Sequence, residues 1–403
     1  MTKIRNCSIC GQEKVDEWID LGEQVVCHHY LKSRREEVYR HNLGLGQCRA
    51  CATVQLTDRI PIQELKPRYD WIRCNEPEDH LDRLVQRISQ LPGITKDSKV
   101  YGISFKEDST LERLNKLGFQ NTWRPDPGRD LGVTDAIVGF QAVGEHFNPE
   151  SARRLVKTHG KADVLIARQI MEHAYDLRGF IEASKQLISP DGYLVFEVPD
   201  CGQALDTCDY VTVWEEHTIY FTEKTFRDCF GFLGLSVVHF EKFPYLIENC
   251  FVAITKPDPS VHVPAPREDD LSGEFSRFKK YADGYGHQKN RIKKFLAGHK
   301  QRNEKVIIFG AGHVGCAVLN FFELKDQIEF VVDDDPHMRG LFMPGSGLPI
   351  LGSKAIYEKD VKLCILTMKT PSDEKVVKNN QRFFEKGGAF VSIFPESRWA
   401  IKF

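Results

Sequence analysis

The stretch ADVLIARQIMEHAYDLRGFIEASKQLISPDGYLVFEVPD, residues 162–200, sets the architecture of the chain. It opens with an apolar run typical of a buried strand, continues with the amphipathic helical pattern LRGFIEASKQLI, and closes with a second apolar run. A strand, a helix and a strand in this order predict two parallel strands joined by a crossover helix. Ligands of such sheets bind at the carboxyl ends of the strands, so residues 168–173 are expected to line a cleft.

The same alternation extends over residues 99–256. Short strand-like runs (VYGIS, NTWRP, LSVVHFE and NCFVAIT) alternate with helical patterns such as TLERLNKL, which predicts a parallel, doubly wound sheet. The preceding segment, residues 59–98, contains HLDRLVQRISQL. Its apolar residues fall on one helical face, so we expect a connector helix that packs on this core. The members of that face are Leu81, Leu84, Val85, Ile88 and Leu91.

A linker and a second α/β unit follow. The stretch PDPSVHVPAPREDD is rich in proline and charge, and a charged helix is predicted over 271–301, so residues 257–302 are taken as linker and long helix. Residues 303–403 then show four buried-strand patterns, beginning with EKVIIFGAGHVG and continuing through IEFVVDDD, KLCILTM and AFVSIF. This pattern predicts a Rossmann-like C-terminal domain.

The C-terminal unit carries a glycine motif in the context that favours nucleotide binding. Gly310, Gly312 and Gly315 lie between a predicted strand and a predicted helix, and Asp333 ends the next strand. Such glycines let the backbone and the helix N-terminus approach phosphates, and the acid reaches a ribose. Both a nucleotide and the dinucleotide NAD satisfy this pattern, and a merely compact turn is the structural alternative.

Four cysteines near the start of the chain have the spacing of zinc ligands. Cys7 and Cys10 form one C-x-x-C pair and Cys48 and Cys51 form the other, which predicts a structural zinc module over residues 1–58. Four thiolates fill the coordination shell, so the metal is expected to stabilise the fold without taking part in chemistry. One of Cys27, His28 and His29, between the two pairs, remains an alternative ligand.

Bulk properties limit the possible partners. With 403 residues the chain should contain two or three domains, and its formal charge of −2 argues against recruitment to nucleic acid or to an anionic membrane. No apolar stretch approaches the roughly 20 residues that span a bilayer, and MTKIRNCSIC is unlike a signal peptide. We therefore expect a cytoplasmic protein, a monomer or small homo-oligomer, with reduced cysteines.

Candidate cofactor and catalytic residues follow the strands of the central domain. A turn with Gly102 and Ser104 after the first strand, an acid after the second, and the residues after the 162–168 run are expected to bind S-adenosylmethionine (SAM). These candidates are Gly102, Ser104, Asp126, Arg168 and Gln169. TVWEEHTIYFT gathers Glu216, His217 and Tyr220 after another strand, an arrangement that favours a histidine general base oriented by a carboxylate. A surface histidine in a polar loop is the alternative.

The chain resembles the SAM-dependent sugar C-methyltransferases, which act on nucleotide-linked 4-keto-deoxysugars. The matching stretches are CSIC with CRACATVQL, residues 162–200, EEHTIYFT, and IIFGAGHVGCAVLNFF with VVDDDPHMRGLFMPGSGLPI. The resemblance implies that His217 removes the proton beside the keto group, that Glu216 steadies it, and that the enolate attacks the methyl group of SAM. It also implies that the C-terminal domain holds the nucleotide-sugar. Substrate-binding residues are then expected to be Tyr69, Trp71, Trp214, Gly310, Gly312, Gly315 and Asp333, with Tyr69 and Trp71 as a wall over the central cleft.

Two departures from that family leave other functions open. Where the family tends to read Tyr-His-Glu-His, this chain reads Trp214, Glu215, Glu216 and His217, and its cofactor turn is poorer in glycine. Alternatives are an epimerase, dehydratase or oxidoreductase that uses NAD in the C-terminal domain, and a non-catalytic binding protein.

Overall fold

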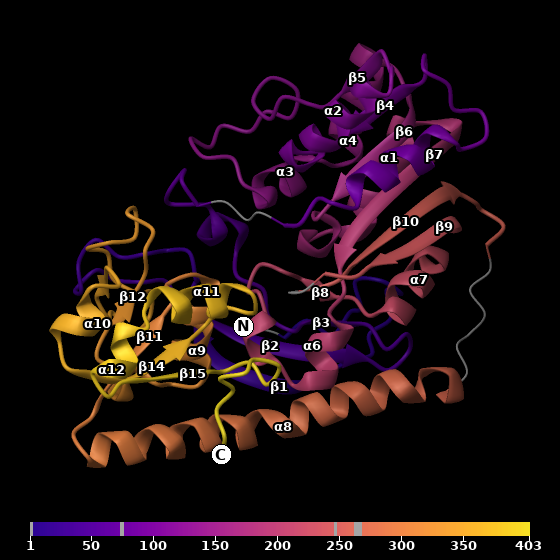
Figure 1. Ribbon diagram of the computed structural model, residues 1–403. Helices are drawn as coiled ribbons and strands as arrows, with labels where there is room; N and C mark the ends of the chain where they lie inside the picture. Colours follow the sequence, from indigo (N-terminus) through magenta and orange to yellow (C-terminus); the bar gives the residue numbers. More distant parts are fainter. Residues whose placement is uncertain (1–2, 73–75, 246–247, 262–267) are drawn as a thin grey trace.

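Three sheets and one long helix organise the protein (Figure 1). The computed structural model describes residues 3–72, 76–245, 248–261 and 268–403. The long helix α8 (Glu268–Gln301) matches the predicted 271–301 helix, while residues 262–267 of the predicted linker lie outside the described residues. Helix α8 contacts α6, β1 and β11, so it joins elements from all three parts of the chain.

The central sheet has six strands in the order β5-β4-β6-β7-β10-β9. Their bounds are Asn121–Trp123, Lys99–Gly102, Ala162–Arg168, Ile188–Pro199, Cys250–Pro257 and Leu235–Phe243. Strands β5, β4, β6 and β7 are parallel, as predicted, but β10 runs antiparallel to both β7 and β9. The prediction of a wholly parallel sheet is therefore wrong at β10. The physical reason is that β9 and β10 pair as a hairpin, which needs no crossover helix.

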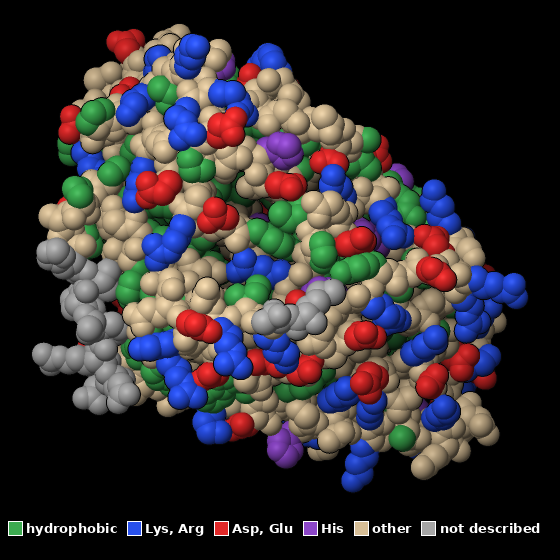
Figure 2. Space-filling model, turned by 180° about the vertical axis from the view of Figure 1, so that it is seen from behind, with side chains coloured by type: hydrophobic (Ala, Val, Ile, Leu, Met, Phe, Trp, Pro, Cys, Tyr) green, Lys and Arg blue, Asp and Glu red, His purple; other side chains and the backbone are tan. Residues whose placement is uncertain are grey.

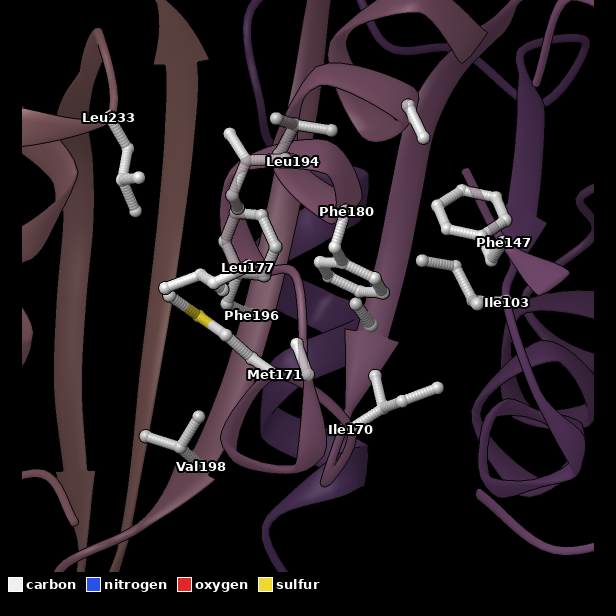
Figure 3. Close-up of a cluster of buried hydrophobic side chains, with 14 of the residues drawn as sticks. Ile103, Phe147, Ile170, Met171, Leu177, Phe180, Leu194, Phe196, Val198 and Leu233 are labelled. Atoms are coloured by element: carbon white, nitrogen blue, oxygen red, sulfur yellow. The ribbon is translucent and has the colours of Figure 1, made fainter. Parts of the chain in front are cut away.

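Helices cover both faces of this sheet. On one face lie α1 (Leu81–Ser89) and α2 (Asp108–Lys116), and the predicted apolar stripe of α1 is buried there. The other face is covered by α3 (Phe140–His146), α4 (Pro149–His159), α5 (Leu177–Leu187) and α7 (Glu223–Phe232). Figure 3 shows its core, where Phe180 of α5 packs beside Leu194 and Phe196 of β7. The carboxyl ends of β4, β6 and β7 are thereby held rigidly.

The N-terminal sheet is completed by a strand from the middle of the chain. Its order is β1 (Val15–Gln24), β2 (His41–Cys48), β3 (Val54–Leu56) and β8 (Ile219–Tyr220), with antiparallel pairing throughout. In β8, Tyr220 pairs with Val54 and Ile219 with Gln55. The cysteine module is therefore continuous with the segment that carries His217.

The C-terminal sheet is entirely parallel, in the order β13-β12-β11-β14-β15. Its strands are Ile350–Leu351, Val331–Val332, Lys305–Phe309, Val361–Leu366 and Ala389–Ser392. The helices are α9 (His313–Phe321), α10 (Ala355–Glu358), α11 (Ser372–Asn379) and α12 (Arg382–Glu385), and α6 (Gly202–Thr207) precedes β8. With β11 in the middle, this is a doubly wound order, and the two-residue strand β13 was not predicted.

The outer surface is mixed in charge. Figure 2 shows acidic and basic side chains interspersed over the face that it presents. Among the described residues, no helix combines the length and the apolar composition that crossing a bilayer requires.

Candidate active site and zinc centre

The four predicted cysteines form one cluster. The sulfur atoms of Cys7 and Cys51 are 3.5 Å apart, those of Cys10 and Cys48 are 3.6 Å apart, and all four lie within 4.8 Å of one another. Sulfurs bound tetrahedrally at about 2.3 Å from a zinc ion would be about 3.8 Å apart, so the thiols fit zinc. Cys27, His28 and His29 do not belong to this group, so the alternative that one of them replaces a cysteine is wrong.

The loop that contains His217 is fixed from two sides. On one side Leu56 of β3 donates its N–H to the Thr218 carbonyl oxygen at 3.1 Å. On the other side the Thr218 hydroxyl donates to the carbonyl oxygens of Glu172 and Ala174, at 3.0 and 2.9 Å. Thr218 therefore positions His217 between the cysteine module and the turn that follows β6.

His217 meets a second histidine that the sequence marked only as lining the cleft. The rings of His217 and His173 are 4.5 Å apart and nearly perpendicular. Burial lowers the pKa of His173 to about 3, and burial, followed by the charges of His173 and His313, lowers the pKa of His217 well below its usual range. Both imidazoles are thus neutral near neutral pH and can accept a proton.

Two carboxyl groups border the histidine pair. Burial raises the pKa of Glu172 to about 8, and burial together with the neighbouring charge of Glu215 raises the pKa of Glu216 to about 8. The Gln141 amide donates a hydrogen bond to the Glu216 carboxylate, so Glu216 is held by α3. The expected pairing of Glu216 with the His217 ring is not found among the described residues. His217 is instead oriented by its ring contacts and by the Thr218 backbone.

Tyr220 has a structural task in this loop. Its hydroxyl donates to the Trp214 carbonyl oxygen at 2.7 Å, and its side chain is buried in the core beside the N-terminal sheet. The predicted catalytic role of this phenol is therefore not supported by its placement, because its hydroxyl proton is used in the hydrogen bond to Trp214 within the same loop.

The turn after β4 is built around Glu107, a residue without a predicted role. Its carboxylate accepts the N–H groups of Ile103, Ser104 and Arg168, at 3.2, 2.5 and 2.7 Å. A Cβ atom on Gly102 would lie 2.5 Å from the Glu107 Cβ, so glycine is required there by this inward carboxylate. Ser104 caps the turn by accepting the N–H of Lys106 at 3.1 Å. Gly102 and Ser104 therefore shape the turn at the expected cofactor site.

Arg168 and Gln169 direct their side chains to the buried carboxylate of Glu197. The Arg168 guanidinium pairs with Glu197 at 2.9 Å, the Gln169 amide donates to Glu197 at 3.1 Å, and His80 completes the group at 2.8 Å. Although burial acts in the opposite direction, Arg168 and His80 hold the pKa of Glu197 at about 2. Both side chains are thus engaged by Glu197, so their placement does not support the predicted contacts with the cofactor. Asp126 is exposed on a turn beyond β5 and remains a prediction.

Removing the Arg168 charge is expected to destabilise the fold. In Arg168→Met, Glu197 keeps a buried charge with only His80 and the Gln169 amide beside it, and breaking a buried pair typically costs about 3–5 kcal/mol of unfolding free energy. Chemical denaturation measures this loss. Arg154→Met is the control, because its exposed pair with Glu150 should contribute about 0–1 kcal/mol. If Arg168→Met keeps the parental stability but loses its affinity for SAM, Arg168 contacts the cofactor as the sequence predicted.

Features between the β4 turn and the histidine pair fit SAM. Phe105 stacks on Phe140 at 4.9 Å, and Phe140 stacks on His173 at 5.3 Å. Beside them Glu172 is 1% exposed, and neither of its carboxylate oxygens has a hydrogen-bond partner among the described residues. Aromatic faces suit a ligand that carries a sulfonium and an ammonium cation, and such a cation beside Glu172 would favour the ionised form of its carboxyl group.

The glycine loop of the C-terminal domain lies next to the loop that carries Trp214, which stacks on His313. A Cβ atom on Gly315 would lie 2.1 Å from the Gly310 carbonyl oxygen, so the strand and α9 pack closely there, whereas Gly312 has no neighbour within 4 Å. The Asp333 carboxylate accepts the N–H groups of Ala311 and Asp335, at 2.7 and 2.9 Å. Because one oxygen holds the glycine loop at Ala311 and the other holds its own turn at Asp335, the placement of Asp333 supports neither the NAD alternative nor the predicted contact with the substrate.

Trp214, Tyr69 and Trp71 gather at this loop. Trp214 stacks on His313, the first residue of α9, with ring centroids 3.7 Å apart. Tyr69 and Trp71 pack against the core that contains Ala311, and Trp71 stacks on His337 at 5.3 Å. They therefore border the C-terminal domain, and their expected position as a wall over the central cleft is corrected.

Each of the three parts of the chain matches a known protein-domain family. A putative zinc binding domain matches residues 7–65, a methyltransferase domain matches residues 100–240, and a C-methyltransferase C-terminal domain matches residues 252–395. With this domain series and the four-cysteine cluster, the chain is similar along most of its length to the zinc-module SAM-dependent C-methyltransferases. It is a SAM-dependent methyltransferase, and the resemblance noted from the sequence is confirmed.

One relative matches along almost the whole chain. C-methyltransferase NovU from Streptomyces niveus is 24% identical over 413 aligned residues, which cover 98% of this chain and 96% of that protein. Among solved structures, a SAM-dependent methyltransferase from Clostridium acetobutylicum is 11% identical, covers 47% of this chain and 95% of its own, and has a TM-score of 0.31. Another from Anabaena variabilis is 13% identical, covers 45% and 86%, and has a TM-score of 0.28.

The raised pKa of Glu216 predicts a pH dependence of stability. In the folded protein this carboxyl stays protonated up to about pH 8, whereas in the unfolded chain it ionises near pH 4.5. The folded state thus holds the extra proton between these values, and its contribution to stability is complete below the lower pKa and is lost as the pH rises through the upper one.

Denaturation midpoints measured across this range should therefore fall less with rising pH in Glu216→Gln than in the parent protein. Glu112→Gln, on the exposed side of α2, serves as the control. An identical slope in Glu216→Gln and the parent would contradict the assignment.

Proposed function

We propose that the protein methylates a carbon atom of a nucleotide-linked keto-sugar, with His217 as the general base. The observation that carries this proposal is the position of the 214–217 loop, which joins the histidine pair of the methyltransferase domain to the glycine loop through the Trp214–His313 stack. One ligand that reaches both places has a sugar at one end and a diphosphate at the other.

The chemistry follows from the residue types. A proton beside a ketone is weakly acidic, and its removal needs a positioned base. Neutral His217 takes this proton, which leaves an enolate on the sugar, although the burial that lowers its pKa makes it a weaker base than an exposed histidine. SAM, when bound, supplies an electrophilic methyl group, and the carbanionic carbon of the enolate would accept it as the sulfur–methyl bond breaks, which leaves S-adenosylhomocysteine and restores the ketone. Glu216, protonated near neutral pH, adds no negative charge that would oppose enolate formation.

The C-terminal domain supplies the second half of substrate binding in this proposal. The open approach at Gly312 and the N–H groups at the start of α9 suit a diphosphate. Tyr69, Trp71 and His337 present ring faces near the same loop, which suits a nucleobase. The domain boundaries predicted from the sequence, with nucleotide-sugar binding assigned to residues 303–403, are part of this proposal.

Proton exchange tests the base separately from methyl transfer. The protein is incubated in heavy water with a nucleoside-diphosphate-linked 4-keto-sugar, and deuterium incorporation beside the ketone is followed by proton NMR. Protein-dependent incorporation that disappears in His217→Ala supports the proposal. Exchange at an equal rate in both proteins would refute the role of His217. A panel of nucleotides and keto-sugars then identifies the preferred substrate.

A further inference from the structure

One further group of side chains that could hold a metal ion lies where the three parts of the protein meet. Cys27 follows β1, Glu215 lies in the loop before β8, and His313 opens α9. Their sulfur, carboxylate oxygen and imidazole nitrogen atoms lie within 4.8 Å of one another. The Nδ1 atom of His313 is 3.7 Å from Oε2 of Glu215, and the Cys27 N–H donates to Oε1 of Glu215 at 2.5 Å.

Two of the three groups that converge here have polar atoms without a partner in the part of the chain that the structure describes, while the Cys27 thiol lies beside Cys316 and Glu215. Glu215 is 2% exposed and the His313 side chain 7%. Among the described residues, Oε2 of Glu215 and both ring nitrogens of His313 have no hydrogen-bond partner of normal geometry, although the backbone of Val211 and Val213 lies close to the ring. A buried polar group left unpaired typically costs about 1–3 kcal/mol, and more if it is charged. A bound cation removes this cost.

The geometry and charge suit a divalent transition metal. Nitrogen and oxygen ligands about 2.0–2.1 Å from a tetrahedral zinc ion are about 3.3 Å apart, close to the 3.7 Å between His313 and Glu215. The Trp214 stack fixes the plane of the His313 ring, so the ring cannot turn away from the group. One thiolate and one carboxylate balance two positive charges, which a buried site requires.

We propose that Cys27, Glu215 and His313 bind a second zinc-class cation, distinct from the four-cysteine site. Three protein ligands leave a fourth position for water or for another oxygen ligand, unlike the filled shell of four thiolates. Each ligand comes from a different part of the chain, so the ion also ties the cysteine module, the 214–217 loop and α9 together. The site does not depend on the proposed methyl acceptor.

Metal content of the full-length protein tests this site. Protein produced with added zinc and dialysed without chelator is analysed by mass spectrometry for zinc per chain. We expect about two zinc ions in the parent and about one in Cys27→Ser and in His313→Ala, because only the four-cysteine site remains intact. Thermal melting confirms that each variant is folded. If a variant does not fold, Glu215→Gln replaces it, since the amide keeps the shape of the carboxylate and loses its charge.

The matched control is Cys229→Ser, which removes an equally buried thiol from α7, where Cys229 donates to the Phe226 carbonyl oxygen. This variant should retain about two zinc ions. One zinc ion in the parent protein would overturn the proposal. So would two ions retained in the ligand variants, or an equal loss in the control.

Discussion

His217→Ala is expected to lower the rate of methyl transfer by about 100- to 10,000-fold, the range that a general base typically contributes. Thr218 holds His217 against the ring of His173, and no other described residue occupies this position and could replace the base. The rate is measured with labelled SAM at saturating substrate, and the melting temperature is measured in parallel.

The matched control is His239→Ala, which removes a half-exposed histidine of β9 that pairs with Glu241 on its own strand. Its rate should equal that of the parent. Retention of the parental rate in His217→Ala, in a folded protein that binds SAM, would exclude His217 as the base.

Loss of the structural zinc should have the second large effect. Zinc binding in small modules of this kind is typically worth about 10–16 kcal/mol of apparent free energy, so Cys48→Ser or treatment with a strong chelator should unfold the N-terminal sheet. Because β3 of that sheet pairs with β8, the His217 loop should lose its support at the same time. Activity and the first thermal transition should therefore disappear together as zinc is removed.

The control for this experiment is Cys364→Ser, a buried cysteine of β14 outside the cluster, which should keep its zinc and most of its activity. A protein that loses zinc from Cys7, Cys10, Cys48 and Cys51 and still transfers methyl groups at the parental rate would contradict the link through β8. The zinc would then be a local stabiliser without influence on the active site.

Features encoded locally could be predicted from the sequence. The cysteine pairs, the apolar face of α1 and the glycine motif before α9 each lie within a short segment, so spacing alone identifies them. The strand β8 has two residues and gains its identity only by pairing with β3, which lies far away in the sequence. No local pattern marks it.

The less predictable parts of the site depend on side-chain direction and on distant segments. Arg168 follows β6 as expected, but the buried charge of Glu197 draws it inward. Glu107 could have been suspected, because an acid that follows a glycine-poor turn can satisfy the turn's amides. The contacts of Gln141 with Glu216, and of His313 with Trp214, join residues that only the tertiary fold brings together.

The position of the transferred methyl group tests the account most directly. The protein is incubated with SAM carrying a carbon-13 methyl group and with a nucleoside-diphosphate-linked 4-keto-sugar, and the product is examined by carbon–proton correlation NMR. The account predicts a new methyl group bonded to the ring carbon beside the ketone, formed by the parent protein and absent with His217→Ala. A methyl group on oxygen or nitrogen, or no transfer to any keto-sugar nucleotide by a protein that binds SAM, would contradict it.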